Sequence, residues 1–398
     1  MRAVTLRFSA IQATYGIMGG VYLPFFSASL ASRGISVGTI GLSFAIATLL
    51  RILVSPVAGL IADARDDRRL VLSIFSLGSF AGFLLLALVD DSAAIVLSSV
   101  VAIVLWTSSA PILESATLKA AERSGTPYGA VRVWLSIAFV AGNVISGLAV
   151  SRFGFAIVAP WLAVSAGLQL CTILMLYESE AGNAGGSFGV RFHATFAEAR
   201  ELLGKPVFLL FLTAASLIQG SHIVYYTYAG LIWRNQGMSA AVIGLIWPLG
   251  IIAEILLFMF SAPVVRRIGP VTLILIGALA CALRWTMMAF DPALPPLLVA
   301  QLLHGLTFAV PHLGAMYFIL RATPPRLSAT AQSLYSVAIG IMSSLSLLPA
   351  GYFYAAWGGR IFLLMSAMAI LAAILTALLS ARWTGGRLTE ISASVSAA

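Results

Sequence analysis

Long apolar stretches alternate with short polar turns along the chain, and this alternation predicts its architecture. Each stretch is long enough to cross a bilayer as an α-helix, which takes roughly 20 residues. Breaks at turn residues and charges predict twelve helices, at residues 8–31, 37–62, 70–89, 93–118, 129–151, 155–177, 206–232, 240–264, 270–289, 295–319, 328–352 and 360–381. We therefore expect an all-α membrane protein with twelve transmembrane helices.

Composition and charge place this chain in a membrane and orient it. Of its 398 residues, 60% are hydrophobic and 9% are charged, whereas soluble proteins carry about 25% charged residues. Lys and Arg gather on loops that face the cytoplasm. With the N-terminus inside, sixteen basic residues fall on inner segments and four on outer loops, which predicts that both termini are cytoplasmic. The net charge of +9 then reflects topology, and we expect no nucleic-acid partner.

The chain repeats itself at an offset of 203 residues. The segments RGISVGTIGL (33–42) and QGMSAAVIGL (236–245) agree at Gly, Ser, Ile, Gly and Leu, and the same offset pairs Arg51 with Glu254. Two six-helix halves are the parallel-repeat plan of transporters that rock around a central site. We predict three parts: an N-terminal six-helix half (1–177), a cytoplasmic linker (178–205) and a C-terminal six-helix half (206–398).

Seven ionisable side chains fall well inside the predicted helices, and His222 lies near the outer end of another. A charge near the middle of a bilayer costs about 2.5–3.5 kcal/mol on insertion scales, so such residues are usually paired and functional. They are two carboxylates, three guanidiniums and two imidazoles: Glu114, Glu254, Arg51, Arg132, Arg284, His304 and His312.

The spacing of these residues from the turns predicts how they group. In a helical hairpin, equal distance from the turn means equal depth, because each residue rises 1.5 Å. This rule puts Glu254, Arg284 and His304 at one level, and Glu114 with Arg132 at another. Either group could instead be a static pair that fixes helix packing. His312 lies on a different face from His304, and a packing role fits it equally well.

Polar and aromatic residues form stripes on helices that are otherwise apolar. At helical spacing, such stripes point to a cavity or a protein interior rather than to lipid. We expect His222 and the aromatic rings to line a substrate pocket rather than to have a chemical role. The candidate substrate-binding residues are Gln12, Tyr15 and Tyr22 on the first helix, Gln219, His222 and Tyr226 on the seventh, and Trp247 on the eighth.

Several chemistries are not supported by the sequence. Cys171 and Cys281 both fall within predicted helices, where they fit packing rather than a disulfide or a metal site. The chain shows no metal-ligand motif, nucleophile elbow or phosphate-binding loop. We therefore expect no enzyme activity, no cofactor and no bound metal. Protons, a small-molecule substrate and the bilayer are the expected partners, and we expect a monomer.

The loop GLIADARDDRR (59–69), between the second and third helices, resembles the signature loop of the major facilitator superfamily. The resemblance implies a gating role, in which Gly59 lets helices approach closely and Asp63 pairs with basic groups. Arg68 and Arg69 complete the predicted gate. Asp66 stands where that superfamily usually has its second glycine.

Longer segments carry a more specific resemblance. YGAVRVWLSIAFVAGNVISG (128–147), QGSHIVYYTYAGLIW (219–233), RWTMMA (284–289) and QLLHGLTFAVPHLGAMYFI (301–319) resemble the bacterial phenylpropionate (hydrocinnamate) permease family, which is related to lactose permease. The resemblance covers the whole chain. It implies the major facilitator fold and proton-coupled symport.

The lactose permease pattern matches only some positions here. Glu114 and Arg132 match its sugar-binding pair, while Glu254, Arg284 and His304 match its cluster for binding and coupling. Lactose permease has a carboxylate three residues beyond that histidine, and Thr307 stands there in this chain. Its intramembrane Lys–Asp pair has no match here. The coupling route must therefore differ in part.

Charge favours an acidic substrate. With neutral histidines, the helices hold three positive and two negative charges, and Arg51 has no carboxylate at its level on the neighbouring helix. A surplus guanidinium suits a carboxylate ligand, with Arg132 and Glu114 as further candidate substrate contacts. The aromatic stripes on the helices suit a substrate that carries an aromatic ring. We expect proton-coupled import of a small aromatic carboxylate across the bacterial inner membrane.

Glu254 is the expected proton carrier, with Arg284, His304 and His312 as its coupling partners. A substrate carboxylate that competes for Arg284 or Arg51 would free Glu254 to take a proton, so both would load together. Three other functions remain open: a sugar or nucleoside symporter, a drug/proton antiporter that drives efflux, and a channel or sensory receptor.

Overall fold

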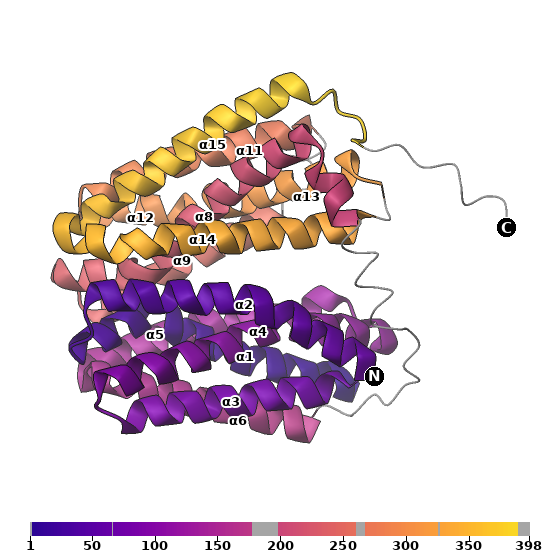
Figure 1. Ribbon diagram of the computed structural model, residues 1–398. Coiled ribbons are helices and arrows are strands. Elements are labelled where there is room, and N and C mark those ends of the chain that lie inside the picture. Colours follow the sequence, from indigo (N-terminus) through magenta and orange to yellow (C-terminus); the bar gives the residue numbers. More distant parts are fainter. Residues whose placement is uncertain (1, 66, 177–197, 260–266, 325–326, 389–398) are drawn as a thin grey trace. The chain divides into compact units, whose positions relative to one another are not determined.

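The computed structural model describes residues 2–65, 67–176, 198–259, 267–324 and 327–388, and every regular element in these ranges is helical (Figure 1). The helices lie close to the predicted segments. Their bounds are α1 Arg2–Ser32, α2 Val37–Arg65, α3 Arg68–Leu88, α4 Ser92–Ser124, α5 Tyr128–Phe153, α6 Val158–Leu176, α8 Pro206–Asn235, α9 Ala240–Met259, α11 Pro270–Ala289, α12 Leu294–Leu302, α13 Val310–Ala322, α14 Ser328–Trp357 and α15 Phe362–Arg382.

Ten segments of the described chain are long and apolar enough to cross a membrane. This number differs from the predicted twelve at two places. Helix α1 is not among the ten, and α14 and α15 fall together in one segment, Thr330–Arg382. Helices α12 and α13 also form one segment, Leu294–Ala322, which a short π-helical stretch interrupts. The chain is therefore an all-helical, multi-pass membrane protein.

The repeated sequence motif forms the same turn twice. Gly34 and Gly237 both adopt positive φ, at 83° and 85°, a conformation that glycine tolerates best. Two residues later, the hydroxyls of Ser36 and Ser239 accept hydrogen bonds from the backbone N–H of Thr39 and Val242, at 3.1 and 3.3 Å. The shared Gly and Ser therefore end one helix and cap the next.

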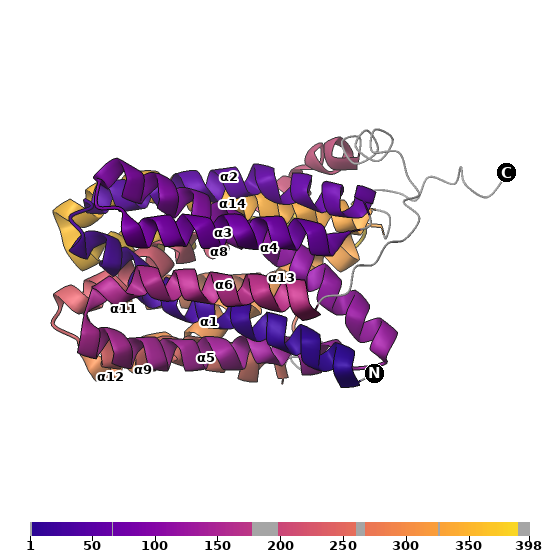
Figure 2. The same ribbon diagram turned by 90° about the horizontal axis from the view of Figure 1, so that it is seen from below.

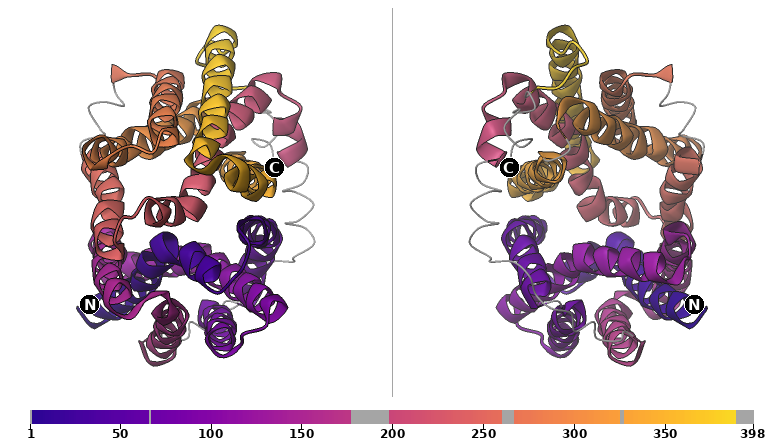
Figure 3. Two further views of the ribbon diagram at one scale, coloured as in Figure 1. Left: turned by 90° about the vertical axis from the view of Figure 1, so that its left-hand side faces the viewer. Right: turned by 90° about the vertical axis from the view of Figure 1, so that its right-hand side faces the viewer.

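The described chain divides into two compact units. The first contains Met1–Gly186, Val224–Pro248 and Leu347–Gly358. Its core is formed by α1 to α6, whose axes are roughly aligned when they are viewed end-on (Figure 3). Helices α3, α6, α1 and α5 lie side by side in that order (Figure 2). Helix α4 packs on α2 and α3.

Close backbone contacts explain why the first unit includes ends of α8 and α9. A Cβ on Gly230 of α8 would overlap the carbonyl oxygen of Pro24 in α1. A Cβ on Gly244 of α9 would lie 2.5 Å from the carbonyl oxygen of Asn143 in α5. Only glycine permits such approaches between helices. These contacts join residues from the two predicted sequence halves within one compact unit.

The second unit contains Ser187–Ile223, Leu249–Ser346 and Gly359–Ala398. Helix α11 is central to it and packs against α12, α13 and α15 (Figure 1). Gly277 of α11 accommodates the ring of Pro311 in α13, because a Cβ there would lie 2.6 Å from three of the ring carbons. This close packing brings α11 against the π-helical stretch Gly305–Ala309.

Candidate functional site

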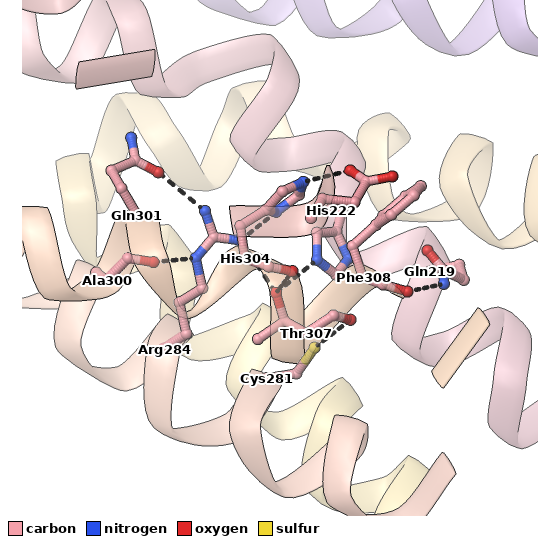
Figure 4. A network of polar contacts seen from close by, with 10 residues as sticks. Gln219, His222, Cys281, Arg284, Ala300, Gln301, His304, Thr307 and Phe308 are labelled. Carbon is pink, nitrogen blue, oxygen red and sulfur yellow. Dashed lines mark hydrogen bonds and ion pairs between the residues drawn. The ribbon is translucent and has the colours of Figure 1, made fainter. Parts of the chain in front are cut away.

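Arg284 is the centre of a buried polar network in the second unit (Figure 4). Its side chain is fully buried on α11. Its Nε donates to the carbonyl oxygen of Ala300 at 2.7 Å, and its Nη2 donates to Oε1 of Gln301 at 3.1 Å. Both acceptors lie on α12. A charge this deep requires such partners, because leaving it unsatisfied would cost several kcal/mol.

The His304 ring lies between Arg284 and Glu254. Arg284 Nη1 is 3.1 Å from His304 Nδ1, and His304 Nε2 is 3.8 Å from Glu254 Oε2. A guanidinium only donates hydrogen bonds, so Nδ1 accepts and the ring proton is on Nε2, facing the carboxylate. The predicted level group is therefore brought together. The His304 ring lies between the two charged groups, an order that equal depth alone does not decide.

Two glycines bring α9 close enough for this contact. A Cβ on Gly250 would lie 3.0 Å from Cβ of His304, and a Cβ on Gly305 would lie 3.0 Å from the carbonyl oxygen of Ala253. A Cβ at either position would be tighter than most packed Cβ contacts, so the neighbouring residue would have to shift by a few tenths of an ångström. The two glycines therefore position Glu254.

Thr307 extends the network to a second imidazole. Its side-chain oxygen is 3.3 Å from Arg284 Nη1 and 3.2 Å from His222 Nε2. Thr307 lies in the π-helical stretch, and such stretches are frequent at functional sites. His222 Nδ1 lies 3.0 Å from the carbonyl oxygen of Ile218 on the same helix. The ring of His222 is fully buried.

Glu114 and Arg132 form the second predicted group, in the first unit. Arg132 Nε donates to Glu114 Oε1 at 2.6 Å, and the hydroxyl of Tyr128 donates to Glu114 Oε2. Arg132 and Glu114 side chains are 34% and 35% exposed. The predicted pair therefore forms, and solvent reaches both partners.

Arg51 stands beside an aromatic cluster in the first unit. It lies within electrostatic reach of Tyr15 and Tyr22. The ring centroids of Tyr15 and Tyr22 are 5.3 and 5.0 Å from that of Trp106. Arg51 is partly exposed, and within the described ranges its guanidinium forms no ion pair or hydrogen bond. Among the described residues, it is thus a cation near two tyrosine side chains, with no carboxylate in contact with its guanidinium.

Three predicted substrate residues are packed inside the protein, away from its surface. Gln12 is fully buried, and its Nε2 donates to Thr117 Oγ1 at 2.8 Å. His222 is held in the network described above. Trp247 is 2% exposed and stacks on Tyr225 at 5.0 Å. Polar and aromatic side chains at helical spacing can face a neighbouring helix as readily as a cavity, and substrate binding by these three residues stays a prediction.

The other candidates on α8 and α13 have local partners. Gln219 Nε2 donates to the carbonyl oxygen of Phe308 at 3.1 Å, and Tyr226 is partly buried against Tyr225. His312 stacks on Phe308, with ring centroids 6.5 Å apart. In the described part of the chain, His312 forms ring contacts and no hydrogen bond. It therefore lies outside the Arg284 network.

The predicted gate is only partly described. A Cβ on Gly59 would meet no described atom within 4 Å, and its role in a close helix approach stays a prediction. The side chain of Asp63 lies outside the described residues. Arg68 is buried at the start of α3, and Arg69 Nη2 donates to the carbonyl oxygen of Leu174. Arg69 therefore ties α3 to the end of α6.

Sequence reasoning missed four residues that complete these sites. Gln301 and Thr307 bind Arg284, Tyr128 binds Glu114, and Trp106 packs on both tyrosines near Arg51. Gln301 lies three residues before His304, on the same helical face, and that spacing could have identified it. Among the described residues, no group of three His, Cys, Asp or Glu could hold a metal ion.

Comparison with known proteins agrees with this architecture. The probable 3-phenylpropionic acid transporter of Escherichia coli (strain K12) is 29% identical over 377 residues, which are 90% of this chain and 93% of that protein. Maltose permease of Geobacillus stearothermophilus is 27% identical over 369 residues, 91% of each chain. The crystal structure of the nucleoside transporter NupG has a TM-score of 0.81 at 15% identity and covers 95% of this chain and 99% of that one.

The matched family extends over both compact units. Residues 13–365 match the MFS_1 like family. The similar proteins are membrane transporters and not enzymes. The chain therefore belongs to the MFS_1 like family, a family of transporters of the major facilitator type.

Proposed function

We propose that this protein is a proton-coupled symporter that imports a small aromatic carboxylate across the bacterial inner membrane by alternating access. Protons and the organic acid enter together, and the chain acts as a monomer with both termini in the cytoplasm. The similar transporter of Escherichia coli supports this substrate class, because its name assigns 3-phenylpropionic acid to it.

The observation that carries the proposal is the environment of Arg51. Of the three intramembrane guanidiniums, Arg132 pairs with Glu114 and Arg284 is buried among hydrogen-bond acceptors. Arg51 has no carboxylate among the described residues and lies near tyrosine rings. A guanidinium binds a carboxylate with two parallel hydrogen bonds. An aromatic acid would supply a carboxylate for Arg51 and a ring that can pack against Tyr15 or Tyr22.

Coupling to protons is assigned to Glu254. It is one of two carboxylates in the predicted helices, and its contact with His304 connects it to Arg284. A positive neighbour favours the ionised carboxylate, whereas an apolar environment favours the neutral acid. A change in the Arg284–His304 contact during transport would therefore change the proton affinity of Glu254. We propose that Glu254 takes up one proton from outside and releases it inside.

The test is uptake into proteoliposomes that contain the purified protein. Radiolabelled 3-phenylpropionate is offered with and without an imposed inward proton gradient. We expect accumulation above the external concentration only with the gradient, and abolition by a protonophore. Equal accumulation with and without the gradient would refute proton symport. Extrusion of the compound from loaded vesicles, driven by a proton gradient, would indicate an antiporter.

A neutral sugar or nucleoside is the second candidate substrate class. The solvent-exposed Glu114–Arg132 pair favours it, because an ion pair with both partners accessible can bind hydroxyl groups. The 27% identity to maltose permease points the same way. Competition of 3-phenylpropionate uptake by maltose, uridine and benzoate distinguishes the classes. We expect inhibition by benzoate alone.

A further inference from the structure

Thr307 connects the buried imidazole of His222 to Arg284. Its side-chain oxygen lies 3.3 Å from Arg284 Nη1, 3.2 Å from His222 Nε2 and 3.2 Å from the carbonyl oxygen of His304. Thr307 and His222 are both fully buried. A hydroxyl has one proton to donate and two lone pairs to accept. The hydroxyl proton can be donated to the His304 carbonyl oxygen or to His222 Nε2, and the state of His222 decides whether Nε2 can accept it.

The neutral His222 ring has one consistent arrangement here. Its Nδ1 faces the carbonyl oxygen of Ile218 at 3.0 Å. A carbonyl only accepts, so Nδ1 carries the proton and Nε2 has the lone pair. Nε2 then accepts from the Thr307 hydroxyl. Edge-to-face contacts with Trp285 and Phe308, at 5.0 and 5.7 Å, hold the ring in this orientation.

This hydrogen bond determines how Thr307 meets Arg284. When the hydroxyl proton points to His222, the oxygen lone pairs are left for Arg284 Nη1. The same Nη1 also lies 3.1 Å from His304 Nδ1. Thr307 and His304 therefore share one guanidinium nitrogen, and Thr307 limits how far Arg284 can move from His304. As long as Arg284 donates to Nδ1, the proton of His304 stays on Nε2, toward Glu254.

We propose that His222 and Thr307 are positioning residues of the proton-coupling network: through the Thr307 hydroxyl, His222 holds Arg284 against His304. The inference rests on the proposed proton symport. It assigns His222 to coupling, whereas its sequence pattern suggested substrate binding. Without the Thr307 hydroxyl, Arg284 can leave His304. The ring can then move its proton to Nδ1, and Glu254 loses the N–H that faces it.

Four substitutions separate positioning from folding. Thr307→Val removes the hydroxyl at nearly constant shape, and His222→Phe removes both ring nitrogens but keeps the aromatic contacts. Thr307→Ser and His222→Gln keep a polar group at the required position and should restore function. The matched control is Ser221→Ala, in which the adjacent residue loses the hydroxyl that accepts from Trp285 Nε1 at 3.0 Å.

The measurements use 3-phenylpropionate as the probe in proteoliposomes. Accumulation driven by a proton gradient reports coupling, and exchange of internal for external probe at equal pH reports binding and alternating access. Proton entry per molecule of probe is followed with a pH-sensitive dye inside the vesicles. We expect Thr307→Val and His222→Phe to lower accumulation and proton entry about tenfold, the effect of losing one buried hydrogen-bond partner. Exchange should change less than about twofold.

Three results would overturn the proposal. Accumulation equal to that of the unsubstituted protein in both Thr307→Val and His222→Phe would show that Arg284 needs no positioning. An equal loss of exchange and accumulation in His222→Phe, with weaker probe binding, would make His222 a substrate-binding residue. Failure of both Thr307→Ser and His222→Gln to recover coupling, while Ser221→Ala retains it, would assign the losses to packing.

The unsubstituted protein distinguishes this inference from the proposed function. If it accumulates probe under a proton gradient, symport holds and the variants decide the role of His222. If it exchanges probe but never accumulates it, symport itself is wrong, and the coupling role of His222 falls with it.

Discussion

Arg132 and Glu114 lie eighteen residues apart in the chain and meet in an ion pair whose Nε–Oε1 distance is 2.6 Å. Tyr128, one turn before Arg132 on α5, donates its hydroxyl to the other oxygen of Glu114. Both charged side chains are about one third exposed. An accessible ion pair adds little to stability. A large effect of breaking it would therefore have to come from function.

The first prediction concerns this pair. Arg132→Gln should lower the free energy of unfolding by less than about 1 kcal/mol, because solvent screens the partners. Uptake of 3-phenylpropionate should fall much further if the pair contacts substrate. Thermal midpoints of the detergent-purified protein and initial uptake rates measure the two effects. A loss of uptake no larger than the loss of stability explains would show that the pair only holds α4 against α5.

The second prediction concerns the proton. Glu254→Gln keeps the size of the side chain but removes its titration, so uphill accumulation under a proton gradient should be abolished. Exchange of internal for external substrate should survive, because exchange moves no net proton. Both are measured in the same proteoliposomes. Unchanged accumulation in Glu254→Gln would exclude it as the proton carrier.

Helix depth was predictable from the sequence, whereas side-chain order was not. A fixed rise per residue places Glu254, Arg284 and His304 at one level. The bridging position of His304 depends on rotamers and on how closely α9 approaches. That approach depends on Gly250 and Gly305, and glycines occur in transmembrane helices for many reasons. The π-helical stretch that presents Thr307 also has no clear sequence signal.

The repeat was a stronger guide than the loop motif. Its shared Gly and Ser correspond to real backbone features, namely positive φ at Gly34 and Gly237 and caps at Ser36 and Ser239. A backbone conformation that few residue types tolerate can be recognised from the sequence, because the same residue types recur at that position. Gly59 was expected to permit a close helix contact, and open space surrounds it among the described atoms. The close contacts occur at other glycines instead.

The third prediction tests one of those contacts. In Gly230→Ala, the new Cβ would overlap the carbonyl oxygen of Pro24, and backbone atoms cannot rotate away. We expect a loss of about 1–3 kcal/mol of stability, the usual cost of overpacking. The melting temperature of the purified protein measures it.

Gly129→Ala is the matched control for this test. Gly129 lies near the start of α5, where an added Cβ would meet no described atom within 4 Å. Alanine favours helix by up to about 1 kcal/mol relative to glycine, so this variant should melt at the same or a slightly higher temperature. Equal melting temperatures for the two variants would contradict the close approach of α1 and α8 at Gly230.

The last prediction concerns substrate charge at Arg51. If its guanidinium binds the substrate carboxylate, Arg51→Gln should weaken binding of 3-phenylpropionate by about 1.5–3 kcal/mol, the worth of a hydrogen bond to a charged group. The uncharged analogue 3-phenylpropionamide should lose far less, because its amide can bond to glutamine as well as to arginine. Calorimetric titration of purified protein with both ligands separates the cases. Equal losses for acid and amide would mean that Arg51 only shapes the site, and no loss for either would place it outside the site. A selective loss for the acid would connect the Arg51 guanidinium, near Tyr15 and Tyr22, to the chemistry of the substrate.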